Sequence, residues 1–309
     1  MYRPHPRLFL LLTLSAATFP LAGCLFRTRP SDRQFSDRPL KTATQQQLID
    51  YVNNQSVTIR SIQATVDIDA SAGDVKNGRI TDYKEIRGYV LARKPAMLRM
   101  KGLMPVVRNT AFDMVSNGQN FKVWIPAKNE FFLGSNNEEN YRPEKRLENL
   151  RPQYIYDALL LPEIGQDLAV LDNGYETVLD SRRHRVEQPN YSLLVIRKGP
   201  QGAYLSRKID FSRIDLLPYR QRIYDLRGNV VTDAHYQNYK DFEGTSFPST
   251  IGIERPREDY DITLNMVKLE INKTLTDDQF ALEQPPGAEV VHLDQPNASM
   301  TKASDNHSK

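Results

Sequence analysis

Cysteine and histidine are scarce in this 309-residue chain, and their scarcity limits its chemistry. Cys24 is the only cysteine, which excludes a disulfide within the chain, and modification of its thiol would also exclude cysteine-based metal or redox chemistry. No two histidines lie at helical or zinc-type spacing, and no Gly-x-Ser-x-Gly elbow is present. The histidines are His5, His184, His235, His292 and His307. We therefore expect no catalytic residue, no metal site, no cofactor and no enzyme.

The chain also lacks a large charge excess and a second long apolar run. It contains 41 Lys and Arg against 38 Asp and Glu, and loss of Arg3 and Arg7 with an N-terminal signal would leave 39 against 38. Bulk charge therefore gives no support for nucleic-acid binding. After the N-terminal apolar run, no stretch is long and apolar enough to be expected to span a membrane.

The N-terminus has the parts of a secretory signal. A basic start precedes the apolar run Leu8–Leu21, which is too short for a membrane-spanning helix with these flanks. The run ends at Leu21, Ala22, Gly23 and Cys24, which resembles the lipobox of bacterial lipoproteins. The resemblance implies cleavage after residue 23 and lipidation of Cys24, so membrane lipid is an expected partner. The alternative is an ordinary signal with a chance cysteine.

Residues 24–41 are polar and are expected to form a flexible tether. Residues 42–57 place apolar side chains at three- and four-residue spacing, which predicts an amphipathic helix with Thr44 as N-cap. The pattern then changes to alternation, which predicts strands. The expected strands of the first half are Ile62–Ala70, Tyr83–Ala92, Met97–Lys101, Ala111–Ser116, Phe121–Ile125 and Phe131–Gly134, with a turn at Asp74–Gly78 and a tight turn at Asn117-Gly118.

The middle of the chain, Pro143–Ala169, favours helix and predicts one short helix that begins at Arg151-Pro152 and is stopped by Pro162 and Gly165. Strands resume after it at Glu176–Asp180, Tyr191–Lys198, Leu205–Phe211, Leu216–Asp225, Val230–Tyr239, Ser249–Glu254 and Asp261–Asn272, and Phe247-Pro248 is expected to break the chain. Two architectures fit this order: one curved antiparallel sheet covered by helices, and a two-sheet sandwich. The polar end, 295–309, is expected to be disordered.

The order of these elements resembles the LolA/LolB-like lipoprotein-carrier fold. The resemblance rests on Gly88-Tyr89-Val90, on the run from Phe112 to Gly118, on Phe121 to Pro126 and on Tyr224 to Asn229. It implies a mainly β domain over residues 42–294, an incomplete barrel of curved antiparallel sheet with covering helices. It also implies an apolar cavity that holds acyl chains of lipid or lipoprotein cargo.

Cavity-lining residues are expected on the apolar faces of the predicted strands, although for any one of them ordinary core packing is the favoured role. They are Ile62, Val66, Ile68, Val90, Met100, Met114, Val123, Val195, Leu264 and Met266. The segment Tyr154–Ile164 is a candidate lid over the cavity, and a permanently packed helix is its alternative.

An apolar loop between two predicted strands contains Leu103, Met104, Val106 and Val107. The resemblance implies a loop that contacts membrane or cargo, whereas a buried hairpin or edge strand is the alternative. Leu25 is not the aspartate that retains lipoproteins at the inner membrane of enteric bacteria, so the analogy favours an outer-membrane anchor facing the periplasm.

The expected function is therefore that of a lipid-anchored envelope protein that binds acyl chains, with a periplasmic carrier or envelope protein as a possible partner. The alternative is a structural or interaction lipoprotein in which the interior is filled and lipid is not transferred.

Overall fold

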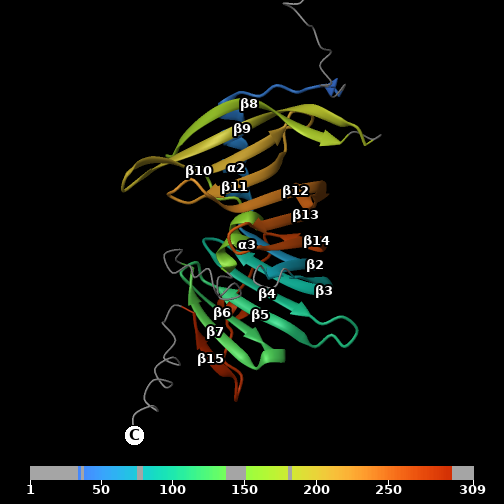
Figure 1. Cartoon of the computed structure of the whole chain (residues 1–309), viewed down its shortest axis with the longest axis vertical. Helices are drawn as coiled ribbons and strands as arrows, with labels where there is room; N and C mark the ends of the chain where they lie inside the picture. The colour runs from blue at the N-terminus through green and yellow to red at the C-terminus, as the bar shows by residue number, and fades with distance from the viewer. Residues whose placement is uncertain (1–33, 36–37, 75–78, 137–150, 180–182, 294–309) are drawn as a thin grey trace, which may run out of the picture. The chain divides into compact units, whose positions relative to one another are not determined.

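The computed structural model describes residues 34–35, 38–74, 79–136, 151–179 and 183–293 (Figure 1). The chain forms two compact units, one of residues 1–37 with 177–188 and one of residues 38–176 with 189–309. In the smaller unit, β1 (Gln34–Phe35) pairs in parallel with Val186 and Glu187 at the start of β9. The predicted tether thus contains a short strand. Within the described residues, no helix has the length and apolar character needed to cross a membrane.

The larger unit is organised by one open sheet. Its strand order is β9-β10-β11-β12-β13-β14-β2-β3-β4-β5-β6-β7-β15, and β8 pairs with β9 off this order. All pairs along the order are antiparallel except β7–β15. The strands are β2 (Ser61–Asp74), β3 (Arg79–Arg93), β4 (Met97–Leu103), β5 (Thr110–Ser116), β6 (Asn120–Ile125), β7 (Glu130–Ser135), β8 (Leu168–Leu179), β9 (Arg185–Gly199), β10 (Gly202–Ser212), β11 (Pro218–Tyr224), β12 (Val230–Phe242), β13 (Thr245–Arg255), β14 (Tyr260–Ile271) and β15 (Glu289–His292).

This arrangement confirms the predicted fold class, a mainly β protein built on one open antiparallel sheet, and not the two-sheet sandwich. The two halves of the chain meet where β2 pairs with β14, with Val66 opposite Met266. In β2 the alternate residues Ile62, Val66 and Ile68 are buried, because successive side chains of a strand point to opposite faces. The alternation of apolar residues that begins at Ile62 therefore identifies which β2 side chains lie on the buried, inner face of the sheet.

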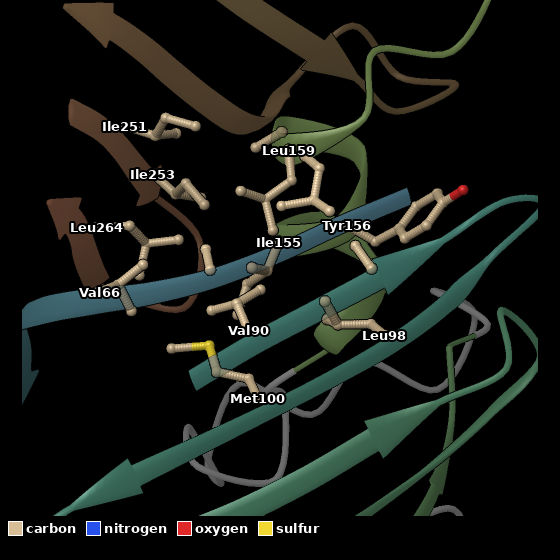
Figure 2. Packing of buried hydrophobic residues seen from close by; sticks show 14 of the residues in the cluster. Val66, Val90, Leu98, Met100, Ile155, Tyr156, Leu159, Ile251, Ile253 and Leu264 are labelled. Carbon is tan, nitrogen blue, oxygen red and sulfur yellow. The ribbon is translucent and has the colours of Figure 1, made fainter. Parts of the chain in front are cut away.

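Two α-helices contribute to the core. Helix α2 (Gln45–Thr58) begins with Thr44, whose hydroxyl accepts a hydrogen bond from the backbone N–H of Gln47 in a capping box. The predicted N-cap is thus confirmed. Leu48 and Val52 of α2 pack in an apolar cluster with strands β9 and β10. Helix α3 (Pro152–Leu159) packs on strands β4, β5 and β13, and its side chains join a larger cluster (Figure 2).

Several predicted boundaries were wrong. Strand β8 begins at Leu168, inside the segment for which helix was favoured. Strand β13 continues through the predicted break at Phe247-Pro248. Pro248 pairs with β12 on one side, whereas pairing with β14 on the other side begins only at Thr250. A proline, which has no backbone N–H to donate, is tolerated where a strand has a neighbour on one side only. The 3-10 helices η2 (Pro126–Lys128) and η5 (Asp277–Phe280) and strand β15 were not predicted. The turn at 75–78 and the tail from 295 lie outside the described residues.

Replacement of Leu98 by alanine is expected to lower the free energy of unfolding by about 2–5 kcal/mol, since Leu98 is completely buried and a cavity would remain. The same change at Leu168, which is 62% exposed, is the matched control and should cost less than about 0.5 kcal/mol. Urea unfolding measures both. Equal losses would contradict the inner-face assignment.

Candidate functional site

The predicted cavity residues all lie on the inner face of the sheet and are all buried. Nine of them belong to one apolar cluster, which also contains residues of α3. The tenth, Val195, belongs to the second cluster, with α2. The sheet therefore brings together residues from both halves of the chain, but they lie in two clusters, one covered by α3 and the other by α2.

Helix α3 occupies the space over this inner face. Its Ile155, Tyr156 and Leu159 are buried in the larger cluster. Figure 2 shows Ile155 and Leu159 on the side of the sheet that also presents Val90 and Leu264. An acyl chain on these strand residues would have to take the place of α3. The segment Tyr154–Ile164, the candidate lid, is thus in a packed position.

A narrow apolar cleft opens at the seam between the two helices. It is lined by Tyr51 and Ile59 from the α2 segment, by Leu159 and by strand residues, and its volume is about 30 Å³. That is about the volume of one water molecule in the liquid. Its lining includes none of the ten predicted residues. Lys94 stands at this cleft, where its ammonium group donates hydrogen bonds to the backbone carbonyl and, at 2.6 Å, the hydroxyl of Ser56.

Burial lowers the pKa of Lys94, because an ammonium ion is poorly solvated there. A positive charge at the entrance of an apolar cleft favours an anionic group beside it.

The start of α3 rests on a buried ion pair. Arg255 donates from Nε and Nη2 to the two carboxylate oxygens of Glu258, at 3.0 and 2.8 Å, and from Nη1 to the hydroxyl of Thr232 at 2.7 Å. Its guanidinium carbon lies 3.3 Å from the centre of the Tyr154 ring, which is cation–π geometry. This pair fixes the first turn of α3 to the ends of strands β12 and β13.

The middle of α3 is held by two further polar groups. The hydroxyl of Tyr156 donates to the carbonyl of Pro95 at 2.6 Å. The side-chain amide of Gln221, itself fully buried, donates to the carbonyl of Asp157 and to the hydroxyl of Tyr236, both at 3.3 Å. All of these hydrogen bonds join neutral groups, and those of Gln221 are also long, so they are weaker than the charge-assisted bonds of the buried ion pair. The helix is therefore fixed more strongly at its start than at its middle.

The segment after α3 is held by side chains from elsewhere in the chain. Arg207 donates from Nη1 to the carbonyl of Pro162 at 2.7 Å, and the side-chain oxygen of Asn53 accepts from the N–H of Ile164 at 2.8 Å. Burial lowers the pKa of Arg207 to about 10. A buried cation that binds backbone carbonyls restrains this connection without contributing apolar surface.

The predicted membrane loop is exposed. Between β4 and β5, Val106 is 97% exposed, Val107 65% and Met104 46%, while Leu103 is the last residue of β4. Val106 has a φ of 68°, which is strained for a β-branched residue. The buried-hairpin alternative does not describe this loop.

The lipobox residues Leu21, Ala22, Gly23 and Cys24 lie outside the described residues, so signal cleavage and lipidation remain predictions. Sequence reasoning missed the polar groups that hold α3, namely Arg255, Arg207 and Gln221. No local pattern distinguishes them, because each becomes buried only when distant elements pack on it.

Comparisons with known proteins concern the fold. No protein-family model matches the chain, and no curated protein matches it. A solved LolA superfamily protein from Nitrosomonas europaea is similar with a TM-score of 0.47 and 16% identity, over 78% of this chain and 99% of that one. A DUF1329 family protein from Desulfovibrio piger gives 0.48 and 16%, over 77% and 95%. A Vibrio parahaemolyticus domain named for outer membrane lipoprotein sorting gives 0.49 and 12%, over 77% and 97%.

Removal of the buried ion pair should expose its role in holding α3. Arg255→Met leaves the carboxylate of Glu258 buried without its cation, so we expect a loss of about 3–5 kcal/mol in the free energy of unfolding. The double variant Arg255→Met, Glu258→Leu should regain most of this loss. Chemical denaturation measures both.

Arg87→Met is the control, because the Arg87–Asp67 pair is solvent-exposed and should contribute less than about 1 kcal/mol. If Arg255→Met lost no more stability than Arg87→Met, the buried pair would not hold α3.

Proposed function

We propose that this protein is an envelope lipoprotein, anchored through Cys24, that binds acyl chains of lipid or lipoprotein between α3 and the inner face of its sheet. The observation that carries the proposal is the position of α3, which covers the apolar strand residues with its own apolar side chains. An acyl chain would make the same kind of contact. No catalytic step is assigned.

The free-energy cost of displacing α3 from the sheet and the gain from burying an acyl chain in its place are comparable. Displacing α3 would expose Ile155, Tyr156 and Leu159, at a cost of about 1.5–3 kcal/mol for each side chain. A chain of about sixteen carbons would gain on the order of 10 kcal/mol gross on leaving water, before ordering costs. The closed state is then favoured without ligand, and an acyl ligand shifts the population toward an open state by its differential affinity.

The cleft between α2 and α3 is the proposed entrance. Apolar side chains of α2, of α3 and of the sheet all line this cleft, and Lys94 lies beside it. An acyl chain entering here would contact Leu159 and Phe247, which line the cleft. Opening requires the weaker bonds of Tyr156 and Gln221 to break, while the Arg255 pair acts as the fixed end.

The exposed loop is the proposed contact with membrane or cargo. Val106 and Val107 present apolar surface to solvent, and Lys101 and Arg108 flank them with charge of the sign that anionic lipid attracts.

A second function is favoured by one observation, the small volume of the cleft. A filled interior together with an exposed apolar loop also fits an interaction lipoprotein, in which α3 never leaves the sheet and the loop binds a protein partner of an envelope assembly. The two functions differ in whether lipid occupies the larger unit.

Acyl binding is tested on the chain from Leu25 onward, secreted behind an ordinary signal and purified from a bacterial periplasm. We expect native mass spectrometry with lipid extraction to find co-purified acyl species. Tyr156→Phe removes the hydrogen bond to Pro95, worth about 0.5–1.5 kcal/mol, and should raise affinity for a fluorescent fatty acid by up to about tenfold.

Tyr89→Phe is the matched control, since Tyr89 is half exposed on the other face of the sheet, and it should leave the affinity unchanged. Protein that carries no lipid and takes up neither fatty acid nor lipopeptide, in the parent and in Tyr156→Phe, would overturn acyl binding and favour the interaction lipoprotein.

Membrane contact is tested by the double variant Val106→Asn, Val107→Asn. Asparagine tolerates positive φ, so folding should be unaffected, while the vesicle affinity of the unlipidated protein, measured by co-sedimentation, should fall by about tenfold or more because each valine adds about 1.5 kcal/mol or more when it leaves water. Val267→Asn, at another exposed valine, is the control. Unchanged sedimentation would remove the loop from the proposal.

A further inference from the structure

A histidine and two carboxylates meet on the outer face of the sheet, away from the helices. Asp233 and His235 are two residues apart on β12, and Glu254 lies opposite Asp233 on β13. The intervening Ala234 and the adjacent Ile253 point to the inner face and are buried in the core. Alternation along both strands therefore fixes all three side chains on the same surface.

The separations between these side chains suit a metal ion better than hydrogen bonds. Nε2 of His235 lies 3.4 Å from Oδ1 of Asp233 and 3.7 Å from Oε1 of Glu254. The first distance is at the limit for a hydrogen bond and the second exceeds it. Bond lengths of about 2.0–2.1 Å around a tetrahedral zinc ion would place neighbouring donor atoms about 3.3 Å apart. The ligand atoms of all three residues lie within 4.8 Å of one another.

The surroundings supply support and charge. Arg220 donates from Nε to Oδ1 of Asp233 at 2.8 Å and from Nη2 to Oδ2 at 2.6 Å, which orients the carboxylate and leaves further lone pairs on its oxygens. Glu176 lies 3.9 Å from Arg220, so this guanidinium faces a second carboxylate besides that of Asp233. Asp233 and Glu254 place two carboxylates beside His235, which favours a divalent cation.

Access to the site is open. Gly252 lies opposite His235 on β13, so no side chain at that position covers the imidazole. Asp233 is buried, whereas Glu254 is more than half exposed. Three protein ligands would leave a fourth position for water or for a side chain of a partner.

We propose that Asp233, His235 and Glu254 bind a divalent transition-metal ion of the zinc type, which would bridge strands β12 and β13. Sequence spacing between histidines did not predict this site, because its other two ligands are carboxylates, one of them from a neighbouring strand. The proposal is independent of acyl binding.

The test is isothermal titration of zinc chloride into tag-free protein carrying Cys24→Ala, so that neither a tag nor a thiol competes. We expect one zinc ion per chain and a visible absorption band when cobalt replaces zinc. His235→Ala should weaken zinc binding at least tenfold, and Glu254→Gln, at an exposed position, should weaken it with little effect on the unfolding midpoint.

His292→Ala, at an exposed histidine of β15, is the control and should retain parental affinity. Equal zinc affinity in His235→Ala and the parent would overturn the proposal. Absence of zinc binding at a hundred-micromolar free concentration would also overturn it.

Discussion

The need to bury one face of an open sheet is the constraint on which the rest of this structure depends. A closed barrel or a sandwich covers its inner face with its own strands, whereas in the described part of the chain this sheet stays open and runs from β1 and β8, which both pair with β9, to β15. Its apolar face must therefore be covered by something else. Helices α2 and α3 do so, each over a separate cluster that contains Leu193 in one case and Leu98 in the other.

Because α3 covers one of the two clusters, it contributes to stability and is also central to the proposed acyl binding. A helix of eight residues is too short to be stable alone and depends on the sheet beneath it. Its buried side chains contribute to the core, yet the surface that it covers is the one an acyl chain would use. Strong anchoring at Arg255 with weaker hydrogen bonds at Tyr156 and Gln221 would allow one element to serve as core in the empty protein and as lid during binding.

The outer face of the sheet is organised by polar interactions and not by apolar burial. Because it is not covered by α2 or α3, its polar side chains interact across neighbouring strands, as Asp210 does with Arg222 and Asp233 with Arg220. Such cross-strand groups depend on register, which places Glu254 opposite Asp233. The proposed metal site is one product of that register. The proposed acyl binding on the inner face and the proposed metal binding on the outer face would thereby be separated by a single layer of backbone.

The sequence by itself determined the features that depend on neighbours in the chain. Alternation in β2, the N-cap at Thr44 and the one open antiparallel sheet followed from local patterns and from resemblance, as did the inner-face position of residues such as Val66. Only the tertiary structure decided that α3 fills the inner face, that Arg255 is buried beneath Tyr154 and that Glu254 meets His235. A strand's own period says which face a residue occupies, whereas strand pairing and helix packing, set by contacts between distant segments, decide what lies opposite it.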